Sequence, residues 1–275
     1  MISSNNPRYI FFGTPDFAVT VLAELCAAGI PPVAIVTNPD RPAGRKKEIT
    51  PSVVKQYALA HAIPLLQPEV LDDVFVRALQ NYNAPVGVLA AYGTIVPATV
   101  FNAFPKGIVV VHPSLLPRYR GATPIQSALV AGEDITGTTL FIMDEKVDHG
   151  PVLATQHVPL LDSDTYTTLA DKLAEASAEL LVDTLARYIS GAITPVVQNE
   201  QGASYTKKLK SEDGFVDVEK DDPITVWRKV RALNPEPGVW TMKDGKRMKI
   251  LDAGMVDGAL IIRKIQFDGG KPQEV

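Results

Sequence analysis

Short apolar runs alternate with segments of helical period through the first 190 residues of the chain. The apolar runs lie at 8–12, 32–37, 65–68, 86–90 and 107–112, and helix-period segments lie at 16–25, 52–60 and 69–80. A strand followed by a helix, repeated many times, predicts a parallel sheet with helices on both faces. We therefore expect a doubly wound, mostly parallel α/β domain.

The pattern continues and then changes character near residue 190. We expect a helix starting near Thr123, strands at 136–143 and 151–158, and a long helix from Thr165 to Tyr188. Glycine and proline then interrupt a connector, after which one helix and several short alternating strands follow. The predicted division is a first domain over 1–190, a linker over 191–210 and a smaller β domain over 211–275.

Composition and charge narrow the class of protein. The chain has 275 residues, of which 46% are hydrophobic and 21% charged, as in an ordinary soluble globular protein. It has no apolar run near the roughly 20 residues that cross a bilayer and no secretory leader, so we expect a cytoplasmic protein without a membrane partner. The single cysteine excludes an intramolecular disulfide.

Charge is unevenly placed along the chain. The formal net charge of −4 argues against non-specific coating of nucleic acid, which needs a strongly basic surface. Residues 207–275 nevertheless carry 14 Lys and Arg against 12 Asp and Glu, whereas the preceding part carries 13 against 19. A polyanion-facing C-terminal segment and a merely solvated surface are both consistent with this asymmetry.

The first candidate motif is FFGTPDFAV, at the end of the first predicted strand. Gly13 permits a tight turn, and Thr14 or Asp16 can cap the helix that follows. Open α/β sheets bind ligands at such carboxyl ends of strands. A strand-to-helix turn without a ligand explains the motif equally well.

The second motif, from Asn38 to Lys55, is rich in proline and contains four basic residues before the next helix. We expect no regular structure there, and a long loop at the ligand edge of a sheet is usually functional. The basic residues, which favour phosphate, are Arg41, Arg45, Lys46 and Lys47. The alternative is a solvated, flexible insertion.

The third stretch, from Leu89 to Gly150, carries the most chemistry. Tyr92 and Gly93 follow one apolar strand, and His112 ends the next. Asp148 comes 36 residues after His112, but strand ends converge at one edge of a sheet, so the two side chains can meet. A histidine beside a carboxylate suits acid, base or oxyanion duty. Taken singly, His112 can be structural and Asp148 a turn former.

Several motifs, in order, carry a resemblance: GTPDFA, NPDRPAGR, AYGTIVP, HPSLLPRYRGATPIQ and MDEKVDHG. Over residues 8 to about 240 the chain resembles the methionyl-tRNA formyltransferases, a group within the folate-dependent formyltransferase family. The resemblance implies a Rossmann-like formyltransferase domain with a β-barrel-like, OB-type C-terminal domain. It also implies formyl transfer from 10-formyltetrahydrofolate to the amino group of initiator methionyl-tRNA, without a metal. We expect a monomer.

The resemblance further implies which residues form the sites. His112 and Asp148 occupy catalytic positions of the family, together with the position held here by Val110. The positions expected to hold the folate are Leu89, Ala90, Tyr92, Gly93, Thr94, Ile95, Ser114, Leu115, Leu116, Pro117, Asp144 and Val147. The positions expected to hold tRNA are Arg41, Arg45, Lys46, Lys47, Lys208, Lys210 and Arg247.

Two departures from the family pattern bear on activity. The family places an asparagine two residues before the catalytic histidine, whereas this chain has Val110 there. Loss of one preorganised oxyanion donor typically slows an enzyme about 10²- to 10³-fold. The strands after Arg247 are also fewer than the family pattern has, which reduces the platform for tRNA.

Three functions therefore remain open from the sequence. The first is formylation of methionyl-tRNA, at a reduced rate because two of the three catalytic positions are kept. The second is a weak or inactive paralogue that binds tRNA or folate without turnover, which Val110 favours. The third is formylation of another amine, such as an amino sugar nucleotide, which has no need of the basic loop.

Overall fold

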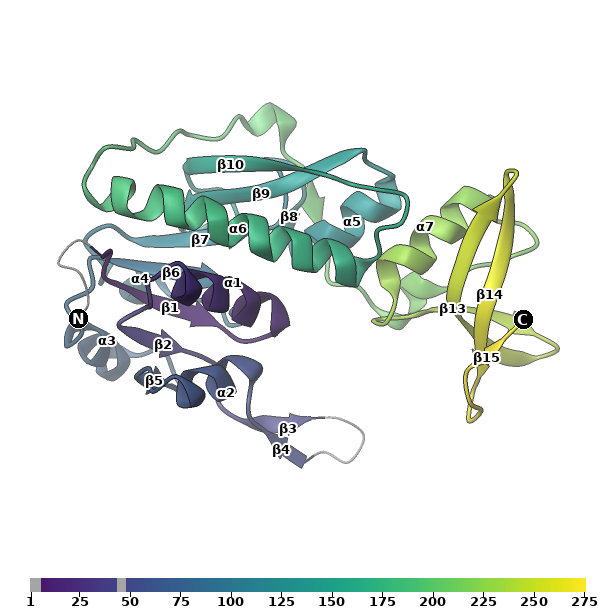
Figure 1. Ribbon diagram of the computed structural model, residues 1–275, viewed down its shortest axis with the longest axis horizontal. Coiled ribbons are helices and arrows are strands. Elements are labelled where there is room, and N and C mark those ends of the chain that lie inside the picture. Colours follow the sequence, from purple (N-terminus) through teal and green to yellow (C-terminus); the bar gives the residue numbers. More distant parts are fainter. Residues whose placement is uncertain (1–5, 44–47) are drawn as a thin grey trace. The chain divides into compact units, whose positions relative to one another are not determined.

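The computed structural model describes residues 6–43 and 48–275. Its central feature is a seven-stranded sheet with the strand order β10-β9-β7-β6-β1-β2-β5 (Figure 1). The strands of this sheet are β1 (Tyr9–Gly13), β2 (Ala34–Val36), β5 (Leu65–Leu66), β6 (Val86–Ala90), β7 (Ile108–His112), β9 (Ile135–Ile142) and β10 (Val152–Pro159).

Parallel pairing dominates this sheet and confirms the prediction from the alternating pattern. Strand β1 pairs in parallel with β2 and β6, β2 with β5, and β6 with β7. Strand β9 runs antiparallel to β7, with Val110 opposite Phe141 and His112 opposite Thr139. Such antiparallel strands are common at the side of an otherwise parallel sheet.

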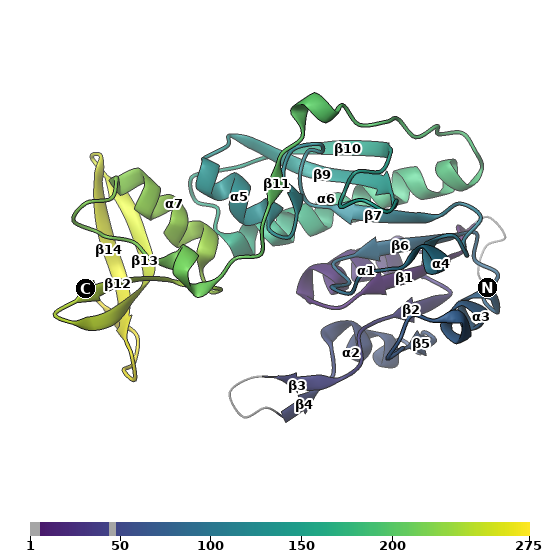
Figure 2. The same cartoon turned by 180° about the vertical axis from the view of Figure 1, so that it is seen from behind.

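Helices cover both faces of the sheet because successive side chains of each strand point to opposite sides. Tyr9 and Phe11 pack in a core with α1 (Asp16–Ala27), α2 (Val53–Ala60) and α6 (Tyr166–Ile189). Ile10 and Phe12 pack in a second core with α3 (Asp73–Gln80) and α4 (Ala98–Phe101), on the side seen in Figure 2. The two cores establish the doubly wound arrangement.

Most of the remaining elements belong to a second compact unit. Its C-terminal part is a four-stranded antiparallel sheet in the order β12-β13-β14-β15, against which α7 packs. The elements of this unit are β8 (Arg120–Gly121), α5 (Pro124–Ala131), β11 (Tyr205–Thr206), α7 (Pro223–Leu233), β12 (Val239–Lys243), β13 (Lys246–Val256), β14 (Ala259–Phe267) and β15 (Gln273–Glu274). The predicted β character of this segment is confirmed.

Contacts in space between Cα atoms divide the chain into two compact units, and this division differs from the predicted one. One unit comprises 1–117, 137–158 and 171–203, and the other comprises 118–136, 159–170 and 204–275. The second unit therefore contains stretches of the predicted first domain. Short 3₁₀ turns at Glu200–Gly202 and Ser211–Gly214 lie in and just after the predicted linker. The boundary at 191–210 stays a prediction.

Two local expectations were wrong. The stretch from Asn38 to Lys55 is not without regular structure, because β3 (Arg41–Ala43) pairs antiparallel with β4 (Glu48–Thr50). Strand β4 is exposed, so no apolar alternation marked it. Helix α1 has no side-chain cap, since the Thr14 hydroxyl donates to the carbonyl of Tyr92 at 2.9 Å instead.

Candidate functional site

The site forms where β6, β7 and β9 lie side by side. Strand β7 is a run of β-branched residues buried on both faces, as expected for a central parallel strand. Val110 lies opposite Leu89 of β6 and Phe141 of β9. Its side chain belongs to the same core as Ile108, and the period of two along a strand turns His112 toward this side.

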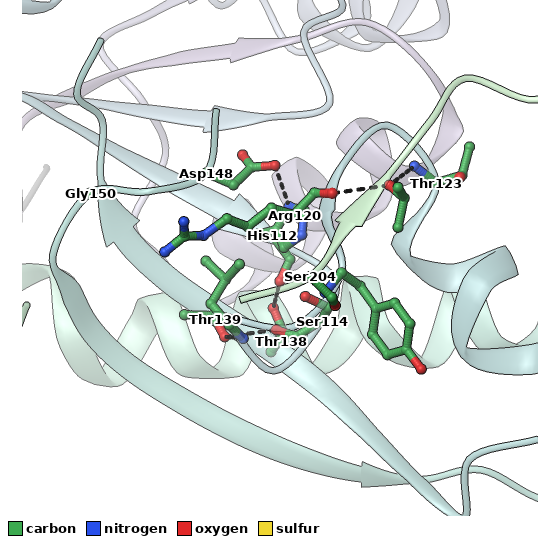
Figure 3. Close-up of polar contacts among 12 residues, drawn as sticks. His112, Ser114, Arg120, Thr123, Thr138, Thr139, Asp148, Gly150 and Ser204 are labelled. Atoms are coloured by element: carbon green, nitrogen blue, oxygen red, sulfur yellow. Dashed lines mark hydrogen bonds and ion pairs between the residues drawn. The ribbon is translucent and has the colours of Figure 1, made fainter. Parts of the chain in front are cut away.

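His112 and Asp148 meet as the sequence predicted. The Nδ1 atom of His112 lies 3.6 Å from Oδ2 of Asp148, and the two side chains are 6% and 19% exposed (Figure 3). The Phe141 ring stands edge-on to the imidazole, at 6.5 Å between centroids and an interplanar angle of 78°. This distance permits an ion pair or a hydrogen bond after a small adjustment, in surroundings that screen charge weakly.

Two threonines of β9 hold the chain that leaves His112. The Thr138 hydroxyl donates to the His112 carbonyl at 3.4 Å, and the Thr139 hydroxyl donates to the Ser114 carbonyl at 2.7 Å (Figure 3). The Thr139 oxygen also accepts from the backbone N–H of Leu116 at 3.1 Å. Thr138 and Thr139 therefore fix the backbone on the C-terminal side of His112.

A cavity of about 530 Å³ opens beside these strand ends, within the usual size range of small-molecule sites. Its walls are the apolar side chains of Leu89, Phe101, Val110 and Phe141 together with the loops 92–98 and 143–148. A second cavity of about 510 Å³ shares Tyr92, Thr94, Ile95 and Pro97 with the first and includes Arg41 and Glu69. The first cavity combines apolar side chains with the polar residues Thr94, Asp144 and Asp148.

Most of the predicted folate positions line the first cavity. They are Leu89, Tyr92, Gly93, Thr94, Ile95, Asp144 and Val147, joined by the catalytic candidates Val110 and Asp148. Ala90 does not line it, because it packs into the core on the opposite face of the sheet. Ser114, Leu115, Leu116 and Pro117 also lie outside the cavity wall. Of these, Ser114 is fully buried and Leu116 packs into the core with Val110.

Sequence reasoning missed several residues that build the cavity. Phe141 lines it and lies opposite Val110 in the register of β7 and β9, which the sequence alone does not reveal. Asn38 orients the loop, since its amide donates to the Tyr92 carbonyl at 2.9 Å and its Oδ1 accepts from the Thr94 hydroxyl at 2.7 Å.

Tyr92 is a neutral, buried member of both cavity walls. Its side chain is almost fully buried and packs edge-on against Phe12, with 5.8 Å between centroids. Burial raises the pKa of the Tyr92 phenol to about 12, so the hydroxyl stays protonated across the physiological range. Its ring is therefore a neutral, packed support for the loop between the two cavities.

The contacts that hold the turn at Asp148 were the other feature missed. His149 Nδ1 lies 2.6 Å from Oδ2 of Asp144, and its Nε2 lies 3.5 Å from Oε1 of Glu200. The Gln198 amide reaches the backbone carbonyls of Asp148 and Gly150. Neither contact is foreseeable from sequence, because Gln198 and Glu200 lie about 50 residues away.

Comparison with known proteins decides the family. The family described as formyl transferase matches residues 7–185, and the one described as formyl transferase, C-terminal domain, matches residues 208–258. The chain belongs to the formyl transferase family. The resemblance seen in the sequence motifs is thereby confirmed.

Individual relatives of this formyl transferase chain agree. It is 42% identical to a methionyl-tRNA formyltransferase of Lachnospira eligens, over 98% of this chain and 84% of that protein. A solved methionyl-tRNA formyltransferase from Clostridium thermocellum has the same fold, with a TM-score of 0.65, 15% identity and coverage of 95% of this chain and 98% of that one.

A solved structure of HypX from Aquifex aeolicus in complex with tetrahydrofolic acid also shares the fold of this family. The TM-score is 0.70 at 19% identity, and the match covers 98% of this chain. This chain spans less than half of the HypX chain, 46% of its length. At such identity the likeness concerns the fold alone.

Of the predicted tRNA positions that the structure describes, three are exposed and Arg247 is partly buried. Arg41 is paired with Glu69 at 2.6 Å, and the two side chains are 65% and 66% exposed. Lys208 and Lys210 are exposed, and the Arg247 guanidinium stacks over the Trp240 ring at 4.2 Å. Arg45, Lys46 and Lys47 lie outside the described residues.

The described residues contain neither a group arranged to hold a metal ion nor a helix fit to span a membrane. Within residues 6–43 and 48–275, no group of three or more His, Cys, Asp or Glu side chains is arranged to hold a metal ion. Over the same ranges, no helix combines the length and the apolar character that a membrane span requires.

Proposed function

We propose that this chain transfers a formyl group from 10-formyltetrahydrofolate to the amino group of methionine on initiator tRNA. The observation that carries the proposal is the buried His112–Asp148 pair beside a cavity of suitable size, in a chain 42% identical to a methionyl-tRNA formyltransferase over almost its whole length. We further propose that it acts as a monomer in the cytoplasm, with its domain boundary within 191–210.

The cavity residues fit a planar folate ring. Leu89, Phe101, Val110 and Phe141 provide apolar surface, and the segments 92–98 and 143–148 complete the wall. Asp144 adds a carboxylate that is oriented by His149 and by the backbone N–H of Lys146. When bound, 10-formyltetrahydrofolate supplies the formyl carbon on which the reaction takes place.

His112 and Asp148 have different roles in the reaction. The amine forms a bond to the formyl carbon, the bond from that carbon to the folate nitrogen breaks, and a proton passes from the amine to the folate nitrogen. His112 donates a hydrogen bond to the formyl oxygen, where negative charge develops. Asp148 orients the imidazole and attracts the proton that the amine loses. Burial of the pair keeps these interactions strong.

Val110 sets the expected rate. Its side chain is 6% exposed and lines the cavity, but it has no hydrogen-bond donor to offer. We therefore propose turnover that is slow by the standard of an enzyme with an asparagine donor, by about 10²- to 10³-fold. This residue is also what favours the second candidate, a paralogue that binds without turnover.

A single-turnover assay tests the proposal. The native chain, in excess over methionyl-tRNA and with 10-formyltetrahydrofolate added, should give formylmethionyl-tRNA above a control without the folate. Native chain that binds the tRNA but forms no product establishes the second candidate instead. Formylation of an amino sugar nucleotide in preference to the tRNA would overturn the assignment of substrate.

A further inference from the structure

The turn that presents Asp148 is held by one amide from a distant part of the same compact unit. Nε2 of Gln198 donates to the carbonyl of Asp148 at 2.9 Å and to the carbonyl of Gly150 at 2.8 Å. The side chain of Gln198 is 92% buried, since the residue is only 8% exposed. One NH₂ group therefore satisfies two carbonyls of the turn at once.

Asp148 needs such support because its backbone is in the left-handed region, with φ at +47°. Residues other than glycine are uncommon in this region. They adopt it where contacts with the surrounding structure offset its energetic cost. Gly150 adds a second constraint, because a Cβ atom at this position would lie 1.8 Å from the Ile142 carbonyl oxygen. The turn thus has a particular shape that its own sequence does not favour.

Strand-like pairing brings Gln198 to this place. Val152 and Val196 exchange two backbone hydrogen bonds, of 2.7 and 2.8 Å, as antiparallel partners. Continuing that register by two residues puts Gln198 opposite Gly150, whose carbonyl accepts from the Gln198 amide. Figure 3 shows Gly150 and Asp148 on the segment that passes His112.

We propose that Gln198 is a positioning residue for Asp148 in formyl transfer. It acts through the backbone of the turn, since its amide donates to the carbonyls of Asp148 and Gly150. The Asp148 carboxylate keeps its place 3.6 Å from His112 because the carbonyls on either side of His149 are tied. The inference rests on the proposed function for its kinetic readout but not for its structural one.

Gln198→Glu is the decisive variant. It keeps the size of the side chain, removes both N–H donors and places a carboxylate against two carbonyls. We expect the single-turnover rate constant to fall about 10- to 100-fold, as for a misplaced catalytic group. The steady-state KM for both substrates should change by less than about threefold. Gln201→Glu is the matched control, because Gln201 is exposed on the same segment, and it should behave as the native chain.

A double substitution separates positioning from general damage. If Gln198 acts through Asp148, then Gln198→Glu should slow an Asp148→Asn background by less than about twofold, because the group being positioned is already lost. Independent, multiplying losses would overturn the proposal. So would an unchanged single-turnover rate constant in Gln198→Glu.

Amide hydrogen exchange tests the same point without activity. Gln198→Glu should lose protection at 148–152 and keep it in β1 and β6, with tetrahydrofolate binding retained. Unchanged protection at 148–152 overturns the proposal even if the native chain fails to formylate tRNA. If Gln198→Glu does not fold, Gln198→Met, which removes the donors without adding charge, takes its place in each measurement.

Discussion

The cavity beside β7 and the outer face of the β12–β15 sheet use charge in opposite ways. At the cavity, His112 is buried, and the Asp148 carboxylate, with a side chain only 19% exposed, lies 3.6 Å from it. In β12 and β13, Val239 and Ile250 point inward, whereas the register sets Trp240 opposite Lys249 on the more exposed face. The cavity has its charged groups in one close pair, whereas the sheet has them at separate positions along an exposed face.

The difference in surroundings determines how substitutions should act. Buried charges interact in a weakly screening medium, so the loss of one partner is large and insensitive to salt. Exposed charges are screened within about 8 Å at physiological ionic strength, so each contributes little and its effect fades with salt. If the cavity and the C-terminal sheet have these separate roles, substitutions in the cavity should have large effects that do not depend on salt. Substitutions on the sheet should have small effects that fade with salt.

His112→Ala should have the largest effect. Removal of the hydrogen-bond donor at the formyl oxygen should lower single-turnover formylation by about 10²- to 10⁴-fold, with little change in tetrahydrofolate affinity. His157→Ala is the matched control, since His157 is exposed on β10. A loss of less than tenfold would mean that the cavity does not concentrate the chemistry as proposed.

Val110→Asn should raise the rate. An asparagine amide at this place on the cavity wall restores an oxyanion donor. We therefore expect the single-turnover rate constant to rise about 10- to 100-fold. Val110→Leu keeps the wall apolar and has no donor, so it should not accelerate the reaction. If both variants are equally slow, another group already serves the formyl oxygen and the deficit assigned to Val110 is wrong.

Gly150→Ala should damage the turn that holds Asp148. A methyl group there would meet the backbone oxygen of Ile142 at 1.8 Å, and a backbone atom cannot rotate away. We expect the free energy of unfolding to fall by about 1–3 kcal/mol, as for an overpacked site, with kcat reduced about tenfold. Gly202→Ala, whose added atom would contact only Pro117 at 3.4 Å, should leave both quantities unchanged in denaturation and kinetic assays.

The sequence predicted the architecture well and the fine structure of the site poorly. Short apolar runs such as 107–112 and the helical period of 165–188 were sufficient for the doubly wound sheet, because burial alone selects those patterns. His112 and Asp148 were found because strand ends converge at one edge. The hairpin of β3 and β4 was missed because an exposed ribbon of prolines and charges has no hydrophobic alternation.

Contacts between distant segments account for the rest. Gln198, Asn38 and Phe141 each act through a register or a hydrogen bond to a residue at least 31 positions away in the chain. No local pattern encodes such a contact. Ala90 illustrates the same limit, since its neighbour Leu89 faces the cavity while Ala90 faces the opposite core.

Arg41→Ala should weaken tRNA binding without affecting the folate. Arg41 is exposed and lies on a short hairpin, so it resembles the C-terminal surface more than the cavity, although it lines the second cavity. We expect tRNA to bind about five- to tenfold more weakly and the salt slope to fall by about one, as for one phosphate contact. Glu69→Gln releases the arginine from its pair and should leave binding equal or tighter. Equal losses for tRNA and tetrahydrofolate would remove Arg41 from the tRNA surface.

Lys249→Ala should have the smallest effect and is the most direct test of the spread-charge surface. Lys249 pairs in register with Trp240 and Gln266 and is partly exposed. Because a single screened contact to phosphate is weak, tRNA affinity should fall about two- to threefold at low salt and the difference should vanish at high salt. Lys271→Ala, exposed beyond β14, serves as the control. A loss that is tenfold or greater, or that persists at high salt, would mean that the outer sheet face also concentrates its binding in single groups, and the contrast with the cavity would fail.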